Sequence, residues 1–187
     1  MAFTALFDAC VLYPAPLRDL LLNLACTGLF RARWSAQIHD EWIRNLSKAR
    51  PELADKLQRT RDAMDRAVPD CLVTDYEGLI DCVTSPDAND RHVVAAAIVG
   101  RADVIVTFNL KDFPARALAP YRVEAQHPDV FVRHVLDLDN AAALSAVRAH
   151  RSSLKSPPKT VEEYLASLAR QGLPETVMFL RRWTNSI

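Results

Sequence analysis

The sequence predicts an α/β fold built on a mostly parallel β-sheet with helices on both faces. Short β-prone apolar runs alternate with segments whose apolar residues recur at helical spacing, until about residue 127. This alternation is typical of βαβ units, in which neighbouring strands run parallel. Beyond residue 127 the pattern is helical only. We therefore expect one α/β domain over residues 1–130 and a C-terminal helical extension over residues 131–187.

Start and stop signals place the elements of the first half. The run "FTALF" predicts a strand that ends at Asp8, and leucines at helical spacing predict a helix that ends near Gly28. Ser35 begins the next helix and Pro51 ends it. In order, we expect strand 3–7, helix 17–24, strand 30–34, helix 35–49, helix 53–64, strand 71–75 and a short helix over 76–83.

An alanine-rich segment and a continuous apolar run mark the second half. The segment "HVVAAAIVG" predicts a buried helix that ends at Gly100. Residues 102–109 form the clearest buried strand, and 121–125 a shorter one. After the linker "RSSLKSPPK", residues 160–183 predict two short helices, the first with a capping box of Thr160 and Glu163. Helices this short are not stable alone in water, so they must dock on the body of the same chain, on a second copy or on a partner protein, and we favour the same chain.

Composition narrows the functional classes. The 23 Lys and Arg residues balance the 23 Asp and Glu residues, so net charge neither favours nor excludes nucleic acid. None of the 4 cysteines forms a CxxC pair, and we expect all of them to be reduced core residues. Trp34 and Trp42 are also expected in the core. No signal peptide and no apolar run of about 18 residues is visible, which predicts a cytoplasmic protein without a membrane partner.

Acidic side chains follow or precede the strands at one predicted edge of the sheet. Asp8 follows the first strand, Asn109 and Asp112 follow the strand at 102–109, and Asp90 opens the alanine-rich helix. Functional residues of open parallel sheets gather at the carboxyl ends of the strands. Glu41, at the border of the apolar face of its helix, is the next candidate. Asp87 lies three residues before Asp90 and is either an auxiliary acid or the helix cap.

Converging carboxylates repel one another and raise their own pKa values unless a cation is present. Oxygen donors of this kind suit Mg²⁺ or Mn²⁺ rather than zinc. Such an ion binds a phosphodiester oxygen and lowers the pKa of a bound water. An acid-only site without a glycine-rich phosphate loop therefore points to metal-assisted phosphodiester hydrolysis.

The order of these motifs resembles the PIN-domain family of metal-dependent ribonucleases. The matching segments are "FDAC", "DEW", "DANDRHVVAAA" and "VTFNLKDF". Within that family the chain is similar to the VapC toxins of bacterial toxin–antitoxin pairs, in particular to longer members with an extension like "PPKTVEEYLASLARQGLPE". The resemblance implies a three-layer α/β/α fold, a Mg²⁺- or Mn²⁺-dependent endoribonuclease, an RNA substrate and an antitoxin partner. It is also compatible with a homodimer.

The resemblance also assigns roles to single residues. Asp8, Glu41 and Asp90 match the three principal acids of the family. Asn109 stands where many members have Asp, and Asp112 is its companion acid or a cap of the next short helix. The predicted catalytic set is Asp8, Glu41, Asp90, Asn109 and Asp112; the predicted metal ligands are Asp8, Asp87 and Asp90; Thr107 is expected to orient an acid; and Arg44, Lys48, Arg91 and Lys111 are candidate RNA contacts.

Alternatives from other classes remain open at this point. An aspartyl-phosphate phosphotransferase also has an Asp after the first strand, but it usually needs a second acid two residues later, where this chain has Cys10. A PIN-like module that binds RNA or protein without cleavage is the other alternative, because Asn109 replaces an acid. His92 is expected to pack or hydrogen-bond at the helix start rather than to act as a base.

Overall fold

The computed structural model describes residues 2–85 and 87–187. Met1, where the predicted domain begins, and Pro86, before the alanine-rich helix, lie outside the described residues. The chain forms a 5-stranded sheet in the order β3-β2-β1-β4-β5, and every neighbouring pair is parallel. The strands are β1 (Phe3–Phe7), β2 (Phe30–Ser35), β3 (Leu72–Val73), β4 (Val104–Val106) and β5 (Glu124–Gln126). The predicted parallel α/β architecture is confirmed.

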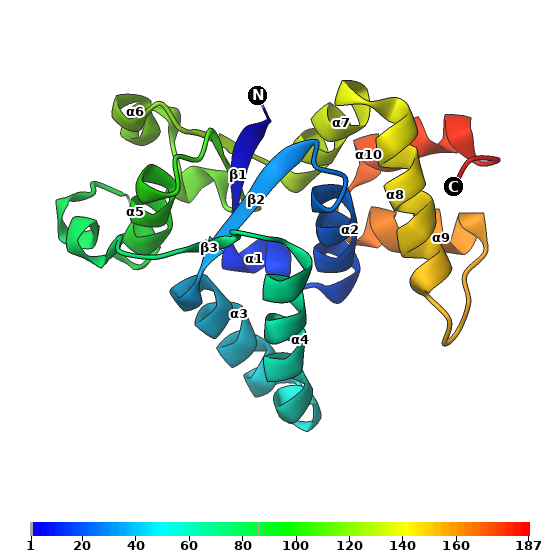
Figure 1. Cartoon of the computed structure of the whole chain (residues 1–187), viewed down its shortest axis with the longest axis horizontal. Helices are drawn as coiled ribbons and strands as arrows, with labels where there is room; N and C mark the ends of the chain where they lie inside the picture. The colour runs from blue at the N-terminus through cyan, green and yellow to red at the C-terminus, as the bar shows by residue number, and fades with distance from the viewer. Residues whose placement is uncertain (1, 86) are drawn as a thin grey trace.

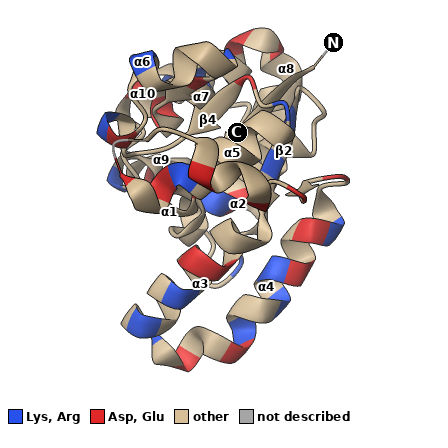
Figure 2. Ribbon diagram, turned by 90° about the vertical axis from the view of Figure 1, so that its left-hand side faces the viewer, with Lys and Arg blue, Asp and Glu red and all other residues tan. Residues whose placement is uncertain are grey.

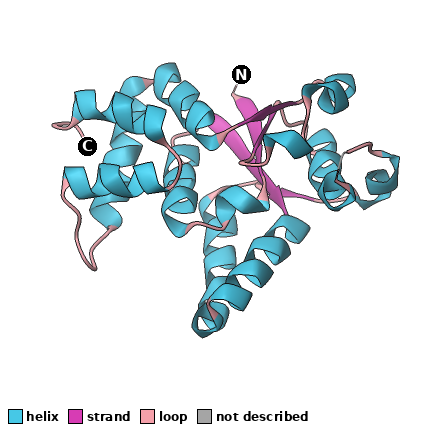
Figure 3. Ribbon diagram, turned by 180° about the vertical axis from the view of Figure 1, so that it is seen from behind, coloured by secondary structure: helices cyan, strands magenta, loops and turns pink. Residues whose placement is uncertain are grey.

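Helices cover both faces of this sheet (Figure 1), and Figure 3 shows the same layers from behind. The α-helices are α1 (Ala9–Leu12), α2 (Ala15–Ala25), α3 (Ala36–Ala49), α4 (Ala54–Ala67), α5 (Arg91–Val99), α6 (Ala115–Leu118), α7 (Pro128–Leu138), α8 (Asn140–Ser153), α9 (Val161–Arg170) and α10 (Pro174–Leu180). Short 3-10 helices are η1 (Pro51–Leu53), η2 (Glu77–Cys82), η3 (Ala88–Asp90), η4 (Leu110–Asp112), η5 (Ala119–Tyr121) and η6 (Arg181–Trp183). Within the described ranges, no helix has the length and apolar character needed to cross a membrane.

Local signals in the sequence account for several of these boundaries. The Ser35 hydroxyl accepts the Ile38 N–H at 3.2 Å and begins α3, as predicted. A Cβ at Gly100 would lie 2.9 Å from the Ala96 carbonyl oxygen and from a Val73 methyl group, so α5 needs glycine at its end. The strand predicted at 102–109 is shorter than expected, because the backbone turns into η4 after Asn109.

The cysteine prediction is wrong in part. All four are free, and Cys71 is buried, but Cys10 is half-buried while Cys26 and Cys82 are exposed. Cys26 follows the last turn of α2, and Cys82 ends the 3-10 helix η2. Apolar neighbours in sequence do not determine which way a residue faces at the end of a short element. Trp34 and Trp42 are fully buried, as expected.

The α3–α4 hairpin projects from the body and is anchored at its base (Figure 1). Asp65 on α4 accepts the Trp34 indole N–H at 2.8 Å and lies 2.9 Å from His39 Nε2. The Trp42 indole N–H donates to His39 Nδ1 at 3.0 Å, so Nε2 carries the ring proton and donates to Asp65. Burial lowers the pKa of His39, which keeps the ring neutral. This network ties both helices to strand β2.

The C-terminal helices dock on the same chain, as predicted. Helix α8 packs against α2, and α10 packs against α7 and α9. The carboxylate of Asp129, which is 4% exposed, accepts the backbone N–H groups of Glu175 and Thr176, each at 2.8 Å. The expected capping box of Thr160 and Glu163 is present at the start of α9. The predicted boundary after residue 130 falls within α7.

Replacing the buried carboxylate should loosen this docking. We expect Asp129→Ala to lower the free energy of unfolding by about 2–4 kcal/mol, because two buried N–H donors lose a charged acceptor. Chemical denaturation followed by circular dichroism measures the loss. Asp139→Ala is the matched control, since the Asp139 side chain caps α8 on an exposed surface, and it should cost only about 1 kcal/mol. Equal losses in the two variants would contradict a special anchoring role for Asp129.

Candidate active site

The predicted catalytic and metal-binding residues other than Asp8 line one hollow at the carboxyl edge of the sheet. This acidic hollow has a volume of about 650 Å³, and its lining residues come from α3, from the segment before α5 and from η4. They are Gln37, Asp40, Glu41, Arg44, Asp87, Asn89, Asp90, His92, Asn109 and Asp112. A smaller adjoining hollow of about 320 Å³ shares Glu41 and Asn109 and includes Cys10 and Tyr13. The structure therefore brings Glu41, Asp87, Asp90, Asn109 and Asp112 together.

Asp8 lies beneath this edge, at the end of β1, and is 4% exposed. Its backbone N–H donates to the Val106 carbonyl at 3.1 Å, which holds it beside β4. Its Oδ2 atom accepts the Thr107 hydroxyl at 2.7 Å, the contact expected of a residue that orients an acid. Burial raises the pKa of Asp8, and the nearby Glu41 charge adds to the rise, while hydrogen bonds from Cys10 and Thr107 oppose it.

Cys10 is a member of the site that the sequence did not identify. Its thiol is 3.0 Å from Asp8 Oδ2, and its sulfur accepts the Phe108 N–H at 3.3 Å. Burial raises the pKa of the Cys10 thiol, and the Asp8 charge raises it further, so the thiol is protonated and donates. The feature of the sequence that could have identified Cys10 is its position two residues after Asp8, in the helix α1 that follows β1.

The two acids before α5 have different local roles. Asp87 Oδ1 accepts the Asn89 N–H at 2.8 Å and caps the 3-10 turn η3. Asp90 stands at the N-cap position of α5, but its side chain makes no capping hydrogen bond. Burial raises the pKa of Asp90 to about 6, and the charges of Asp8, Asp87, Asp112 and Glu41 contribute in that order. No local structural requirement of the helix explains the Asp90 carboxylate.

Glu41 lines the same hollow from α3, and its carboxylate lies next to His92 of α5. His92 Nε2 lies 3.4 Å from Glu41 Oε2, and the His92 side chain is 4% exposed. Among the described residues, no partner lies within hydrogen-bond distance of His92 Nδ1. His92 thus packs at the start of α5, as expected, and its Nε2 atom faces an acid of the site.

Of the four residues predicted to contact RNA, one lines the acidic hollow and three do not. Arg44 lines the acidic hollow and is the one Lys or Arg among its described lining residues. Lys48 is exposed one turn further along α3, Lys111 is exposed on η4, and Arg91 is half-buried at the start of α5; none of the three lines the hollow. Figure 2 shows acidic residues near the start of α3, basic residues further along it, and residues of both signs mixed along α4. A long single-sign basic surface is therefore not formed by this hairpin.

The donor set fits a hard divalent cation in charge and in atom type. Within residues 2–85 and 87–187, no three His, Cys, Asp or Glu side chains already stand together as a metal-binding group. The acids around the hollow nevertheless offer carboxylate oxygens, and the pKa values of Asp8 and Asp90 are raised. Such oxygens suit Mg²⁺ or Mn²⁺, which retain several water ligands.

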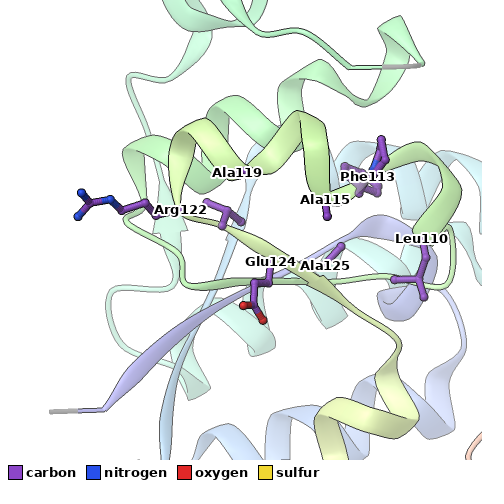
Figure 4. Close-up of a pocket in the computed structure, with 9 residues that line it drawn as sticks. Leu110, Phe113, Ala115, Ala119, Arg122, Glu124 and Ala125 are labelled. Atoms are coloured by element: carbon purple, nitrogen blue, oxygen red, sulfur yellow. The ribbon is translucent and has the colours of Figure 1, made fainter.

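A second pocket lies beside the edge strand β5 (Figure 4). Its volume is about 680 Å³, and it is lined mainly by apolar residues between η4, α6 and β5. Arg122 and Glu124 are its charged residues. Leu110, which lines this pocket, directly follows Asn109, which lines the acidic hollow. Glu124 is the one acid among the described residues that line this pocket, whereas the clustered acids line the acidic hollow. We therefore do not take this pocket as the candidate active site.

Comparison with known proteins agrees with this geometry. Residues 4–111 match the PIN domain model, which is more than half of the chain, and residues 128–182 match the VapC50 C-terminal domain. The chain belongs to the PIN-domain family. More particularly, it joins a PIN domain to a C-terminal domain of the VapC50 type, and the three-layer α/β/α fold is that of the family.

One curated relative is the Mycobacterium tuberculosis (strain ATCC 25618 / H37Rv) protein named "Putative ribonuclease VapC50". It is 43% identical over 93 residues, which are 50% of this chain and 54% of that protein. The match thus spans about half the length of the relative. No solved structure matches the chain.

The raised pKa of Asp90 predicts how stability changes with pH. In metal-free buffer the folded protein binds the Asp90 proton more tightly than the unfolded chain, so this group costs stability as pH rises from about 4 through 6. We expect Asp90→Asn to stabilise the metal-free protein at about pH 7.5 by about 1 kcal/mol, after a discount for partial exposure to solvent. The difference should vanish at about pH 4.

Thermal unfolding in EDTA measures this effect, with an expected rise of about 2–4 °C for Asp90→Asn. Asp62→Asn, on the exposed surface of α4, is the control and should leave the midpoint unchanged. A lower midpoint for Asp90→Asn at neutral pH would show that Asp90 is a structural residue of the helix start.

Proposed function

We propose that the chain is a metal-dependent endoribonuclease and the toxin of a type II toxin–antitoxin pair. The observation that carries the proposal is Asp90, a carboxylate that four neighbouring acids repel and that no helix cap requires. The relative with a matching segment is named as a ribonuclease, and the PIN family assignment supports the same activity. The proposed partners are an RNA substrate and a cognate antitoxin protein in the cytoplasm, and a homodimer is compatible with the proposal.

Asp8, Asp90 and, as an auxiliary, Asp87 would hold Mg²⁺ or Mn²⁺, with Glu41, Asn109 and Asp112 around it. When bound, the ion supplies a water of lowered pKa and neutralises charge on a phosphodiester. Residues of the protein orient the ligands of the ion. Thr107, at the exit of β4, donates to the Asp8 carboxylate and limits its rotation.

The neutral side chain of Asn109 lowers the negative charge that an RNA phosphate meets in the acidic hollow. Arg44 supplies the opposite charge from the α3 wall. This pairing lets a phosphodiester approach a group of carboxylates that would otherwise repel it. Asn109 and Arg44 are therefore proposed to be part of substrate binding.

A non-cleaving PIN-like module that binds RNA or protein is the second candidate function. Asn109 favours it, because an acid is replaced at a position where many family members have one. The two candidates differ in a single measurable property, which is metal-dependent strand scission.

Cleavage of mixed-sequence RNA in Mg²⁺, with an EDTA control, decides between the two. We expect scission by the purified protein and a loss of at least about 100-fold in Asp90→Asn, because the variant removes one ligand and its charge. Asp62→Asn should cleave like the unaltered protein. Expression in bacterial cells should halt growth for the unaltered chain and not for Asp90→Asn. RNA binding without scission at any divalent ion tested would favour the non-cleaving module.

The role of Arg44 has its own test. Arg44→Ala should raise KM for RNA about tenfold with little change in kcat, because a phosphate contact is lost while the acids remain. The slope of log KM against log salt should fall by about one. Lys48→Ala, one turn away on the same helix, is the matched control and should change neither quantity. An equal effect of both variants would show that α3 attracts RNA only through diffuse charge.

A further inference from the structure

We propose that Cys10 is a positioning residue, which acts with Thr107 as a two-donor clamp on Asp8. The proposal rests on the proposed metal-dependent function, because it concerns how Asp8 is presented to a cation. Cys10 otherwise only argues against a phosphotransferase, and the proposed function needs Asp8 to be fixed without requiring that a thiol fixes it.

The two donors converge on the same atom. The Cys10 thiol lies 3.0 Å and the Thr107 hydroxyl 2.7 Å from Asp8 Oδ2. The sulfur and the hydroxyl oxygen are themselves 3.4 Å apart, so the three groups form a closed triangle. Within the described chain, Oδ1 receives no hydrogen bond from a side chain. Two side chains therefore hold one oxygen of the carboxylate, and among the described residues no side chain donates to the other.

Backbone groups fix the positions of both donors. The Phe108 N–H donates to the Cys10 sulfur at 3.3 Å, and the Asn109 N–H donates to the Thr107 hydroxyl oxygen at 2.9 Å. Cys10 and Thr107 thus each accept a hydrogen bond from a backbone N–H that follows β4, and each donates a hydrogen bond to Asp8. Because the N–H groups occupy one lone pair of each donor, the S–H and O–H bonds are directed toward the carboxylate.

Cys71 shows what a thiol without this arrangement looks like. Its sulfur is 3.7 Å from Asp65 Oδ1 and 3.9 Å from the Asp65 carbonyl, so its proton is shared between two distant acceptors. Asp65 is instead held by the N–H groups of Trp34 and His39. Cys71 is therefore a matched control, because it is a buried thiol beside a carboxylate that does not depend on it.

The experiment measures Mn²⁺ binding to the full chain by electron paramagnetic resonance in the absence of RNA. We expect Cys10→Ala to raise the Kd for Mn²⁺ about tenfold, because the freed carboxylate loses orientation. Cys10→Ser should bind within about threefold of the unaltered protein, since a hydroxyl restores the donor. Cys71→Ala should bind like the unaltered protein. Thermal unfolding in EDTA confirms that each variant is folded.

A double variant tests whether the two donors form one clamp. Thr107→Val should also weaken Mn²⁺ binding, and Cys10→Ala with Thr107→Val should weaken it by more than the product of the single effects. This excess is expected because each donor partly replaces the other when one is lost.

Three results would overturn the clamp: unchanged Mn²⁺ binding in Cys10→Ala, a loss in Cys10→Ser equal to that in Cys10→Ala, or an equal loss in Cys71→Ala. Absence of Mn²⁺ binding by the unaltered protein is a different outcome. It would remove the proposed metal-dependent function itself, and with it the purpose of the clamp.

Discussion

The buried carboxylate of Asp8 is the group on which the rest of the site depends. It stands at the end of the central strand β1, between β2 and β4, and is only 4% exposed. An ionised carboxylate in such a place needs donors or a cation. Thr107 and Cys10 supply two donors, and both come from the segments that flank the same strand ends. The order of strands β1 and β4 is therefore a requirement of the chemistry as well as of the core.

The sequence predicted the features that local rules determine. The β-prone run of β1 places Asp8 at a strand end, Ser35 caps α3, and the alanine-rich α5 follows Asp90. Each of these follows from residue type and short-range spacing. The sequence also predicted that Asp8, Asp90 and the η4 segment converge, because the carboxyl ends of parallel strands meet at one edge of the sheet.

The features that the sequence did not predict depend on contacts between distant segments. Cys10 meets Thr107 across a separation of 97 residues, and His92 meets Glu41 from another helix. No spacing rule links such pairs in a single sequence. The exposure of Cys26 and Cys82 was missed for a related reason, because both lie at the ends of short elements whose facing is set by their neighbours in space.

Phe108, which follows β4 beside the site, also lies next to the C-terminal domain. The Phe108 ring packs against His127, with ring centroids 5.2 Å apart, at the entrance to α7. A methyl group at Gly172, in the turn between α9 and α10, would lie 3.5 Å from Phe108 Cε1. The backbone N–H of the same Phe108 donates to Cys10. The C-terminal domain therefore supports the position of β4's exit without adding an acid to the site.

Four carboxylates of the chain show how differently burial is compensated. Asp129 receives two backbone N–H groups and serves as an anchor between helices. Burial opposes ionisation of Asp65, but the Trp34 and His39 N–H groups lower its pKa, so its charge is stable without any further partner. Asp8 also receives two donors, yet its pKa remains raised, and so does that of Asp90 beside it. Asp65 and Asp129 are thus satisfied by donors of the protein, whereas Asp8 and Asp90 remain short of positive charge, which is the condition that a bound divalent cation would relieve.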